Sequence, residues 1–246
     1  MLPKYDVLLL DIEGTVTSIQ FVTEVLFPFA RKFAADFLEK HWGEMEVMED
    51  IERFRRLAAD DAECGLDDVI PIPDDSYPAD QIREHVLRSV FRQMDQDRKS
   101  TALKSLQGKI WQQGYATGEL KSVLFPDVVP AFTRWSRRGA KIAIYSSGSV
   151  EAQKLLFKHT TDGDLTPYLS NCFDTMVGPK RAATSYVRIA QILSVPASAV
   201  LFCTDVVAEA EAARDAGMAA VILNRPGNLP QPPHTFPILS TFDSVS

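Results

Sequence analysis

The chain has 246 residues, of which 46% are hydrophobic and 24% are charged. This length suits one large domain or two smaller ones, and the composition is that of a soluble globular protein with a substantial core. The net charge of −7 argues against a protein that binds nucleic acid or an anionic membrane. An acidic protein that acts on a phosphorylated substrate needs local positive charge, and a metal ion is the simplest source.

The three cysteines, Cys64, Cys172 and Cys203, are too few and too widely spaced for a zinc pattern or a disulfide framework. They therefore indicate a reducing compartment. Residues 1–6 lead into a short apolar run that is too short for the hydrophobic part of a signal sequence or for a membrane span. We therefore expect a cytoplasmic protein, with a nuclear location also open if the source is eukaryotic.

The apolar run at residues 7–10 predicts a buried parallel strand, because it consists of branched aliphatic residues bounded by turn residues. Two carboxylates, Asp11 and Glu13, follow where this strand should end. In open α/β sheets, ligands bind at the carboxyl ends of the strands. An acidic pair there predicts a cation site or a proton-transfer role, because unpaired buried carboxylates are costly. A polar turn with a chance acidic pair is the alternative.

The segment from about residue 18 to about residue 123 is predicted to be helical. Apolar residues recur at helical spacing in four places: 29–37, 51–58, 82–94 and 103–111. Pro28 fits the first turn of the first of these helices. We expect most aromatic side chains in this segment to form the core of a helix bundle.

Strands and helices alternate from about residue 124 onward. The expected strands lie at 140–145, 173–177, 200–203 and 219–223, with a last short apolar piece at 236–239. The expected helices lie at 150–159, at 184–193 and in an alanine- and glutamate-rich stretch that ends near Gly217. Such alternation predicts βαβ units and a parallel sheet with helices on both faces.

These segments together predict an α/β fold: a doubly wound, Rossmann-like parallel sheet with an α-helical cap domain inserted after the first strand. Residues 1–17 and 124–246 would form the core, and residues 18–123 would form the cap. Such an insertion would lie over the carboxyl end of the sheet, where the acidic pair is expected.

Three more polar groups follow later strands. The serine-rich segment 146–149 opens a helix, and its hydroxyl and backbone N–H groups can bind an anion or simply cap that helix. Lys180 stands in a loop before a helix, where most lysines are solvated surface charges. Asp205 and Glu209 follow the strand at 200–203, and an acidic first helical turn is their alternative role.

The order carboxylate, hydroxyl, ammonium, carboxylate resembles the haloacid dehalogenase-like superfamily of phosphotransferases. The resemblance implies that Asp11 attacks phosphorus and becomes an aspartyl-phosphate. It implies that Ser146, with Ser147 beside it, binds the phosphorylated substrate. Lys180 would also contact the substrate and neutralise charge in the transition state, and Asp205 would hold Mg²⁺.

One Mg²⁺ ion per subunit suits this set of residues. A phosphate dianion repels a carboxylate nucleophile, and a cation between Asp11, Asp205 and a phosphoryl oxygen removes that repulsion. Mg²⁺ binds a few carboxylates together with water and substrate oxygens. In the superfamily, the residue at the position of Glu13 ligates the metal through its backbone carbonyl, which leaves its side chain free to move a proton. That residue is usually Asp, so Glu13 reaches one methylene further.

A longer set of segments resembles one branch of the superfamily, the enolase-phosphatase E1 (acireductone synthase) family of methionine salvage. The resemblance runs from Val7 to about Phe242 and is weakest between 44 and 99. Its most specific stretch is 145–157. The other segments that carry it are 11–15, 27–28, 110–115, 118–121, 125–128 and 224–228.

This resemblance implies that 2,3-diketo-5-methylthiopentyl 1-phosphate is enolised and then loses phosphate to give an acireductone, both at one Mg²⁺ site. Glu13 is a candidate proton carrier. Glu119 and Lys121, just before the chain rejoins the core, are predicted to face the substrate, with an exposed, salt-bridged turn as the alternative. Trp111 and Tyr115 share a helix face and would either enclose the methylthio tail or form the core of the insertion.

The nearest alternative is a phosphatase of the same superfamily that acts on another small phosphorylated metabolite. A phosphate-sensing receiver module also places an aspartate, a hydroxyl group and a lysine at strand ends. Its acidic pair, however, lies on an earlier strand, and it lacks a large insertion. An inactive scaffold would usually have lost Asp11 or Asp205. We expect a monomer whose partner is the small phosphorylated diketone, with no nucleic-acid or membrane partner.

Overall fold

The computed structural model describes residues 5–245. The chain divides into two compact units, one that ends at Val25 and resumes at Gly118, and one from Leu26 to Thr117. Residues 1–4 and 246 of the expected core lie outside the described residues. The segments 18–25 and 118–123, which the sequence assigned to the cap, belong to the unit that contains the sheet.

Hydrogen bonds explain where segment 118–123 belongs. The backbone N–H of Ser122 donates to His159 O at 2.9 Å, and the hydroxyl of Thr17 donates to Val123 O at 2.5 Å. Gly118 adopts the left-handed conformation, with φ of 77°, directly after the last helix of the other unit. A glycine in this conformation ends a helix readily, so the helical pattern stops at Thr117 rather than near residue 123.

In the part of the chain that is described, the first unit contains a six-stranded sheet in which every neighbouring pair is parallel. The strands in spatial order are β3 (Leu169–Phe173), β2 (Lys141–Tyr145), β1 (Val7–Leu10), β4 (Val200–Thr204), β5 (Ala219–Leu223) and β6 (Ile238–Leu239). β1 lies between β2 and β4, and all its residues are fully buried. The predicted doubly wound α/β architecture is confirmed.

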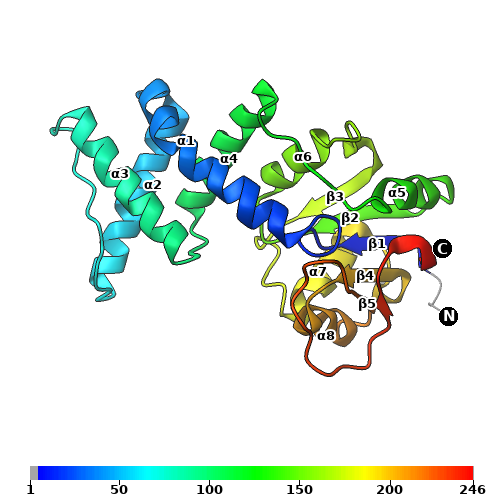
Figure 1. The fold of residues 1–246 in the computed structure, drawn as a ribbon. Helices are drawn as coiled ribbons and strands as arrows, with labels where there is room; N and C mark the ends of the chain where they lie inside the picture. Colours follow the sequence, from blue (N-terminus) through cyan, green and yellow to red (C-terminus); the bar gives the residue numbers. More distant parts are fainter. Residues whose placement is uncertain (1–4, 246) are drawn as a thin grey trace. The chain divides into compact units, whose positions relative to one another are not determined.

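Helices cover both faces of this sheet (Figure 1). On one face are α5 (Val128–Arg137) and α6 (Val150–Lys158), where the rings of Phe132 and Phe157 stack with centroids 6.1 Å apart. On the other are α7 (Ala183–Leu193) and α8 (Val207–Asp215), whose core includes alternate residues of β1. Strand side chains point alternately to the two faces, so a strand covered on both faces is apolar throughout.

The second unit is helical. Its helices are α1 (Phe27–Lys40), α2 (Met45–Glu63), α3 (Ala79–Asp95) and α4 (Thr101–Thr117), preceded by a π-helical turn at Phe21–Leu26. Pro28 lies in the first turn of α1, as its fixed φ angle favours. The apolar stripes of all four helices meet in one core, in which Phe37 is buried and Phe29 and Phe33 are partly buried.

The strand expected at 173–177 is wrong. β3 covers Leu169–Phe173 instead, and the chain turns directly afterwards. Asp174 causes this turn, because its Oδ1 atom accepts a hydrogen bond from the N–H of Met176 at 2.9 Å. β3 is an edge strand with polar residues, which gives it no continuous apolar run.

Short 3₁₀ turns complete the fold at Thr166–Tyr168, Ala197–Ala199 and Phe242–Ser244. Across residues 5–245, none of the helices combines the length and the apolar character needed to cross a membrane.

Candidate active site

Polar side chains of the sheet unit follow the carboxyl ends of three neighbouring strands. Asp11 comes directly after β1, Ser146 follows β2, and Thr204 ends β4 with Asp205 next to it. Because β1 pairs with both β2 and β4, these residues reach the same edge of the sheet. This is the edge at which parallel α/β sheets bind their ligands.

Lys180 joins this edge through two short ion pairs. Its Nζ atom lies 2.6 Å from Asp11 Oδ1 and 2.7 Å from Glu209 Oε2. Thr204 also links the two carboxylates, because its Oγ1 atom is 3.2 Å from both Asp11 Oδ2 and Glu209 Oε2. The side chains of Lys180, Asp11 and Glu209 are each exposed by 10% or less, so the pairs are shielded from water. The lysine is therefore a buried member of the site and not a solvated surface charge.

Negative charge is in excess at this site. Burial, and then the charge of Asp11, raise the pKa of Asp205 to about 7 and that of Glu209 to about 7, while Lys180 acts in the opposite direction. Burial alone would lower the pKa of Lys180, but the charges of Asp11 and Glu209 outweigh it and raise this pKa. Three buried carboxylates near a single ammonium group favour the binding of another cation.

The residues at this edge fit a divalent cation held by few protein ligands. Within residues 5–245, no three Asp, Glu, His or Cys side chains gather as a ready-made metal site. The expected set does not require three, because it combines the carboxylates of Asp11 and Asp205 with the backbone carbonyl of Glu13. Mg²⁺ tolerates so sparse a set, since it keeps several waters or substrate oxygens. Glu13 is half-buried, and its charge contributes to the raised pKa of Asp205.

The turn after β1 brings the backbone close to Asp205. The N–H of Ile12 donates to Asp11 Oδ1 at 2.8 Å, which orients that carboxylate. Gly14 follows with φ of 68°, and a Cβ atom at this position would lie only 2.5 Å from Asp205 Oδ2. Position 14 therefore requires glycine both for its backbone conformation and for the space beside Asp205.

In the loop after β2, the serine that caps the next helix is not one of the serines predicted to bind the phosphoryl group. The cap of α6 is Ser149, whose Oγ atom accepts from Ala152 N at 3.2 Å. The capping alternative therefore applies to Ser149 and not to Ser146 or Ser147. Ser146 is buried, and its Oγ atom accepts from Gly148 N at 3.2 Å.

The backbone that carries Lys180 is held at three consecutive carbonyls, those of residues 178, 179 and 180. The donors are the hydroxyls of Tyr145, Ser185 and Tyr186, at 2.9, 2.8 and 2.7 Å respectively. All three donors are buried. This set was not found from the sequence, because nothing in the spacing of two tyrosines and a serine indicates a shared loop.

The structure of segment 118–123 does not decide whether Glu119 and Lys121 contact the substrate. Glu119 and Lys121 are both exposed, and neither forms an ion pair with any described residue. The turn is therefore exposed, as the alternative predicts, but its described residues 119 and 121 form no salt bridge. A role of Glu119 and Lys121 in binding substrate stays a prediction.

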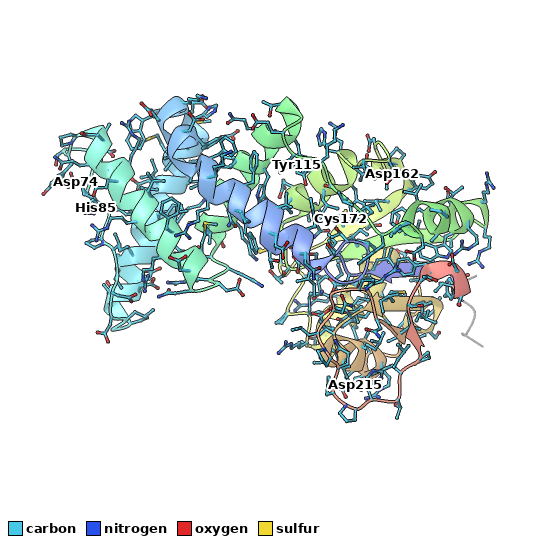
Figure 2. The ribbon with its side chains drawn as sticks, viewed as in Figure 1. Asp74, His85, Tyr115, Asp162, Cys172 and Asp215 are labelled. Atoms are coloured by element: carbon cyan, nitrogen blue, oxygen red, sulfur yellow. The ribbon has the colours of Figure 1, made fainter. Side chains whose placement is uncertain are left out.

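Trp111 and Tyr115 belong to α4 in the helical unit (Figure 2 labels Tyr115). Trp111 packs against the core of that unit, and its Nε1 atom donates to Leu26 O at 2.8 Å. Trp111 therefore serves the core of the insertion. Tyr115 is only 4% exposed, and its role in enclosing the methylthio tail stays a prediction.

Glu209 is a site residue to which the sequence assigned no role. It lies in the first turn of α8, and its carboxylate faces Lys180. Its signal in the sequence is that it is the second carboxylate of the acidic pair after β4.

Comparisons with known proteins agree with this geometry. A family model described as haloacid dehalogenase-like hydrolase matches residues 5–217. Enolase-phosphatase E1 of Anopheles gambiae is 42% identical, over 96% of this chain and 80% of its own length. Enolase-phosphatase E1 of Synechococcus elongatus is 49% identical, over 90% of this chain and 89% of its own. The crystal structure of the UTR4 protein of Saccharomyces cerevisiae superimposes with a TM-score of 0.76 at 30% identity, over 98% of this chain and all of the other.

Proposed function

The chain belongs to the enolase-phosphatase E1 family of haloacid dehalogenase-like hydrolases, which makes it a phosphatase, and we propose that it acts in methionine salvage. Its substrate is 2,3-diketo-5-methylthiopentyl 1-phosphate. Its products are the acireductone 1,2-dihydroxy-3-keto-5-methylthiopentene and phosphate. The observation that carries this proposal is the buried cluster in which Lys180 bridges Asp11 and Glu209 beside Asp205.

In the phosphatase step, a carboxylate oxygen of Asp11 forms a bond to phosphorus while the bond from phosphorus to the substrate oxygen breaks. That oxygen leaves with the bonding electrons and takes up a proton. Water then cleaves the aspartyl-phosphate and regenerates the carboxylate. Lys180 stabilises the charge that spreads over the phosphoryl oxygens, and Ser146 and Ser147 bind those oxygens. The charges of Asp11 and Glu209 raise the pKa of Lys180, so that it is cationic when the substrate binds.

Hydrolases of this family generally depend on a divalent metal. Here the ion is Mg²⁺, one per subunit, held by Asp11, Asp205 and the backbone carbonyl of Glu13. When bound, it supplies the positive charge that lets a carboxylate approach a phosphate dianion. The excess of carboxylates over cations in the cluster supports this assignment.

In the enolisation step, the carbon next to a carbonyl loses a proton and the carbonyl oxygen gains one, which gives the enol. Glu13 is our candidate to carry the proton. The half-buried position of Glu13 beside the cluster supports this role. Glu119 and Lys121 are candidates to contact the remainder of the substrate. We further propose that the protein is a cytoplasmic monomer, also nuclear if its source is eukaryotic, with no nucleic-acid or membrane partner.

The decisive experiment supplies the diketone phosphate with and without Mg²⁺ and follows enol absorbance and free phosphate separately. We expect both signals with Mg²⁺ and neither in its absence. Asp11→Asn serves as the control, because it keeps the size of the side chain and removes the nucleophile. Phosphate release from unrelated small esters without an enol signal from the diketone would instead identify a phosphatase with another substrate.

A further inference from the structure

The loop at 224–228, after β5, holds the turn that follows Asp11 at two consecutive carbonyls. Asn228 Nδ2 donates to Gly14 O at 2.9 Å, and Arg225 Nε donates to Thr15 O at 3.1 Å. Two side chains of one short loop therefore determine where the turn after the nucleophile lies.

The amide of Asn228 has one defined orientation. Its Nδ2 atom donates a second hydrogen bond, to Leu223 O at 3.0 Å. Both amide hydrogens thus meet carbonyl oxygens, and a flipped amide would place its own oxygen against those two acceptors. The Oδ1 atom is left on the other side, buried and without a hydrogen-bond partner among the described residues. A buried acceptor without a donor is costly, so its persistence requires a reason.

Asn228 Oδ1 faces the same small space as Asp205. A Cβ atom built on Gly14 would lie 2.9 Å from Asn228 Oδ1 and 2.5 Å from Asp205 Oδ2. Two oxygen acceptors that converge on one point require a donor or a cation nearby. Water bound to a divalent ion is a strong donor and would satisfy Asn228 Oδ1.

Arg225 fixes the loop at 224–228 to neighbouring segments of the sheet unit. Its guanidinium forms two hydrogen bonds of 2.9 Å with the carboxylate of Asp127, and a third of 2.8 Å with Ser240 O. It also lies between the rings of Phe125 and Phe242, 4.7 Å from each centroid. Arg225 is 4% exposed, so the loop cannot move without breaking a buried bidentate pair.

We propose that Asn228 is a positioning residue of the metal site, which holds Gly14 against Asp205 and accepts a hydrogen bond from a water ligand of the divalent ion. The inference rests on the proposed function only in taking Asp205 as a metal ligand. Asn228 itself touches neither the nucleophile nor phosphorus. Its contribution is to the affinity for the ion, in the way that residues surrounding metal ligands commonly act.

The test measures Mn²⁺ affinity by electron paramagnetic resonance in the full chain. Asn228→Ala removes the amide, and Asn228→Leu removes it while keeping most of the volume. We expect each variant to bind Mn²⁺ about 10- to 100-fold more weakly than the unmodified protein. Asn224→Ala is the matched control, because Asn224 is an exposed residue of the same type in the same loop. Its Mn²⁺ affinity should not change.

A purely structural role would lower the melting temperature of the Asn228 variants and leave Mn²⁺ affinity unchanged, and that result would overturn the inference. A second measurement needs no variant at position 228. Titration of the ¹⁵N-labelled protein with Mg²⁺ should shift the side-chain amide signal of Asn228 but not that of Asn224. An unmoved Asn228 signal at saturating Mg²⁺ also overturns the inference.

The two proposals fail separately. Normal turnover of the diketone phosphate, together with unchanged Mn²⁺ affinity in Asn228→Ala, removes the role of Asn228 and leaves the proposed function intact. Weakened Mn²⁺ binding in Asn228→Ala, together with an unmodified protein that does not turn over the diketone phosphate, supports the role of Asn228 and removes the proposed function.

Discussion

Buried charge is balanced differently in the two units of this molecule. In the helical unit, Asp50 is 1% exposed and contacts two cations, Arg53 and Lys109. In the sheet unit, Asp11, Asp205 and Glu209 are also buried, but Lys180 forms its two ion pairs with Asp11 and Glu209, and its charge acts on Asp205 without an ion pair.

The comparison shows that burial of charge alone does not mark a functional site. In the helical unit, the buried carboxylates of Asp50 and Asp61 each have a cationic partner, and Arg98 lowers the pKa of Asp61 as expected for a satisfied pair. In the sheet unit, burial and mutual repulsion raise the pKa values of Asp205 and Glu209. A cluster that retains an excess of one charge costs stability, and a bound cation offsets that cost.

The largest effect is expected for Asp11→Asn. The amide has the same size but is not a nucleophile, so phosphate release should fall by on the order of 10⁴-fold or more while the fold is retained. Steady-state phosphate release measures the loss, and circular dichroism checks the fold. Appreciable turnover by the folded variant would remove Asp11 from the role of nucleophile.

Lys180→Ala should lower phosphate release by about 10²- to 10³-fold, because it removes the charge that stabilises the phosphoryl oxygens. It also leaves Asp11 and Glu209 facing each other, at a cost of about 3–5 kcal/mol of unfolding free energy in the metal-free protein. Kinetics and urea denaturation measure the two effects.

The matched control is Lys109→Ala in the helical unit. There Asp50 keeps Arg53, so the loss should be about 1 kcal/mol with no change in turnover. Equal losses of stability in the two lysine variants would contradict the contrast between the units.

Stability of the metal-free protein should fall as the pH rises from 5 to 8. The pKa values of Asp205 and Glu209 in the folded protein, each about 7, lie above their ordinary values of 3.8 and 4.5. The folded state therefore binds protons that the unfolded chain has already released. Each group's contribution is complete below its ordinary pKa and is lost as the pH rises through about 7, at about 1.4 kcal/mol per pH unit.

Thermal unfolding at several pH values measures this slope. Asp205→Asn should flatten it, because that variant lacks one of the two titrating groups, and Mg²⁺ should restore stability most at pH 8. An identical slope in the unmodified protein and in Asp205→Asn would show that this cluster does not govern the pH dependence.

Tyr186→Phe should have a smaller effect, because it removes only the hydroxyl that donates to Lys180 O. Leaving that carbonyl without a buried donor costs about 1–3 kcal/mol of unfolding free energy. It should also lower the turnover number several-fold, since the loop that carries Lys180 loses one of its three anchors. Tyr168→Phe is the control, because the Tyr168 hydroxyl contacts Thr133 on the opposite side of the sheet. A reduced turnover number in both variants would mean that the effect is not specific to the Lys180 loop.

The smallest effect is expected for Asp95→Ala in the helical unit. Asp95 pairs with Arg31, but their side chains are 63% and 44% exposed. Such a pair contributes about 0.5 kcal/mol or less, and its removal should leave phosphate release unchanged. Urea denaturation at low and high salt measures this contribution, and a loss comparable with that of Lys180→Ala would be inconsistent with solvent screening.

Elements with a strong local pattern could be predicted from the sequence. β1, β4 and β5 are apolar runs covered on both faces, and the helical stripes of the second unit recur at the correct spacing. The prediction failed at β3, where the edge position permits polar residues. It also extended the cap to residue 123, because the cross-chain hydrogen bonds of Ser122 leave no local pattern.

In the candidate site, too, the sequence indicates some residues and not others. Asp11, Ser146, Lys180 and Asp205 could be proposed because each follows a predicted strand or precedes a predicted helix, and because their order resembles a known superfamily. The residues that hold these groups in place could not be proposed. Tyr186 and Asn228 act on carbonyls in other loops, and no feature of their own segments indicates this.

The sequence by itself determined the class of this protein: the alternating strands and helices, the helical insertion and the family to which its motifs belong. These depend on periodicity and on short segments, which are properties of neighbouring residues. Only the tertiary structure decided that Lys180 is shared by Asp11 and Glu209, and that Asn228 faces Asp205 across Gly14. Charge balance and hydrogen bonding of buried groups depend on distances between segments far apart in the chain, and those distances exist only once the sheet has formed.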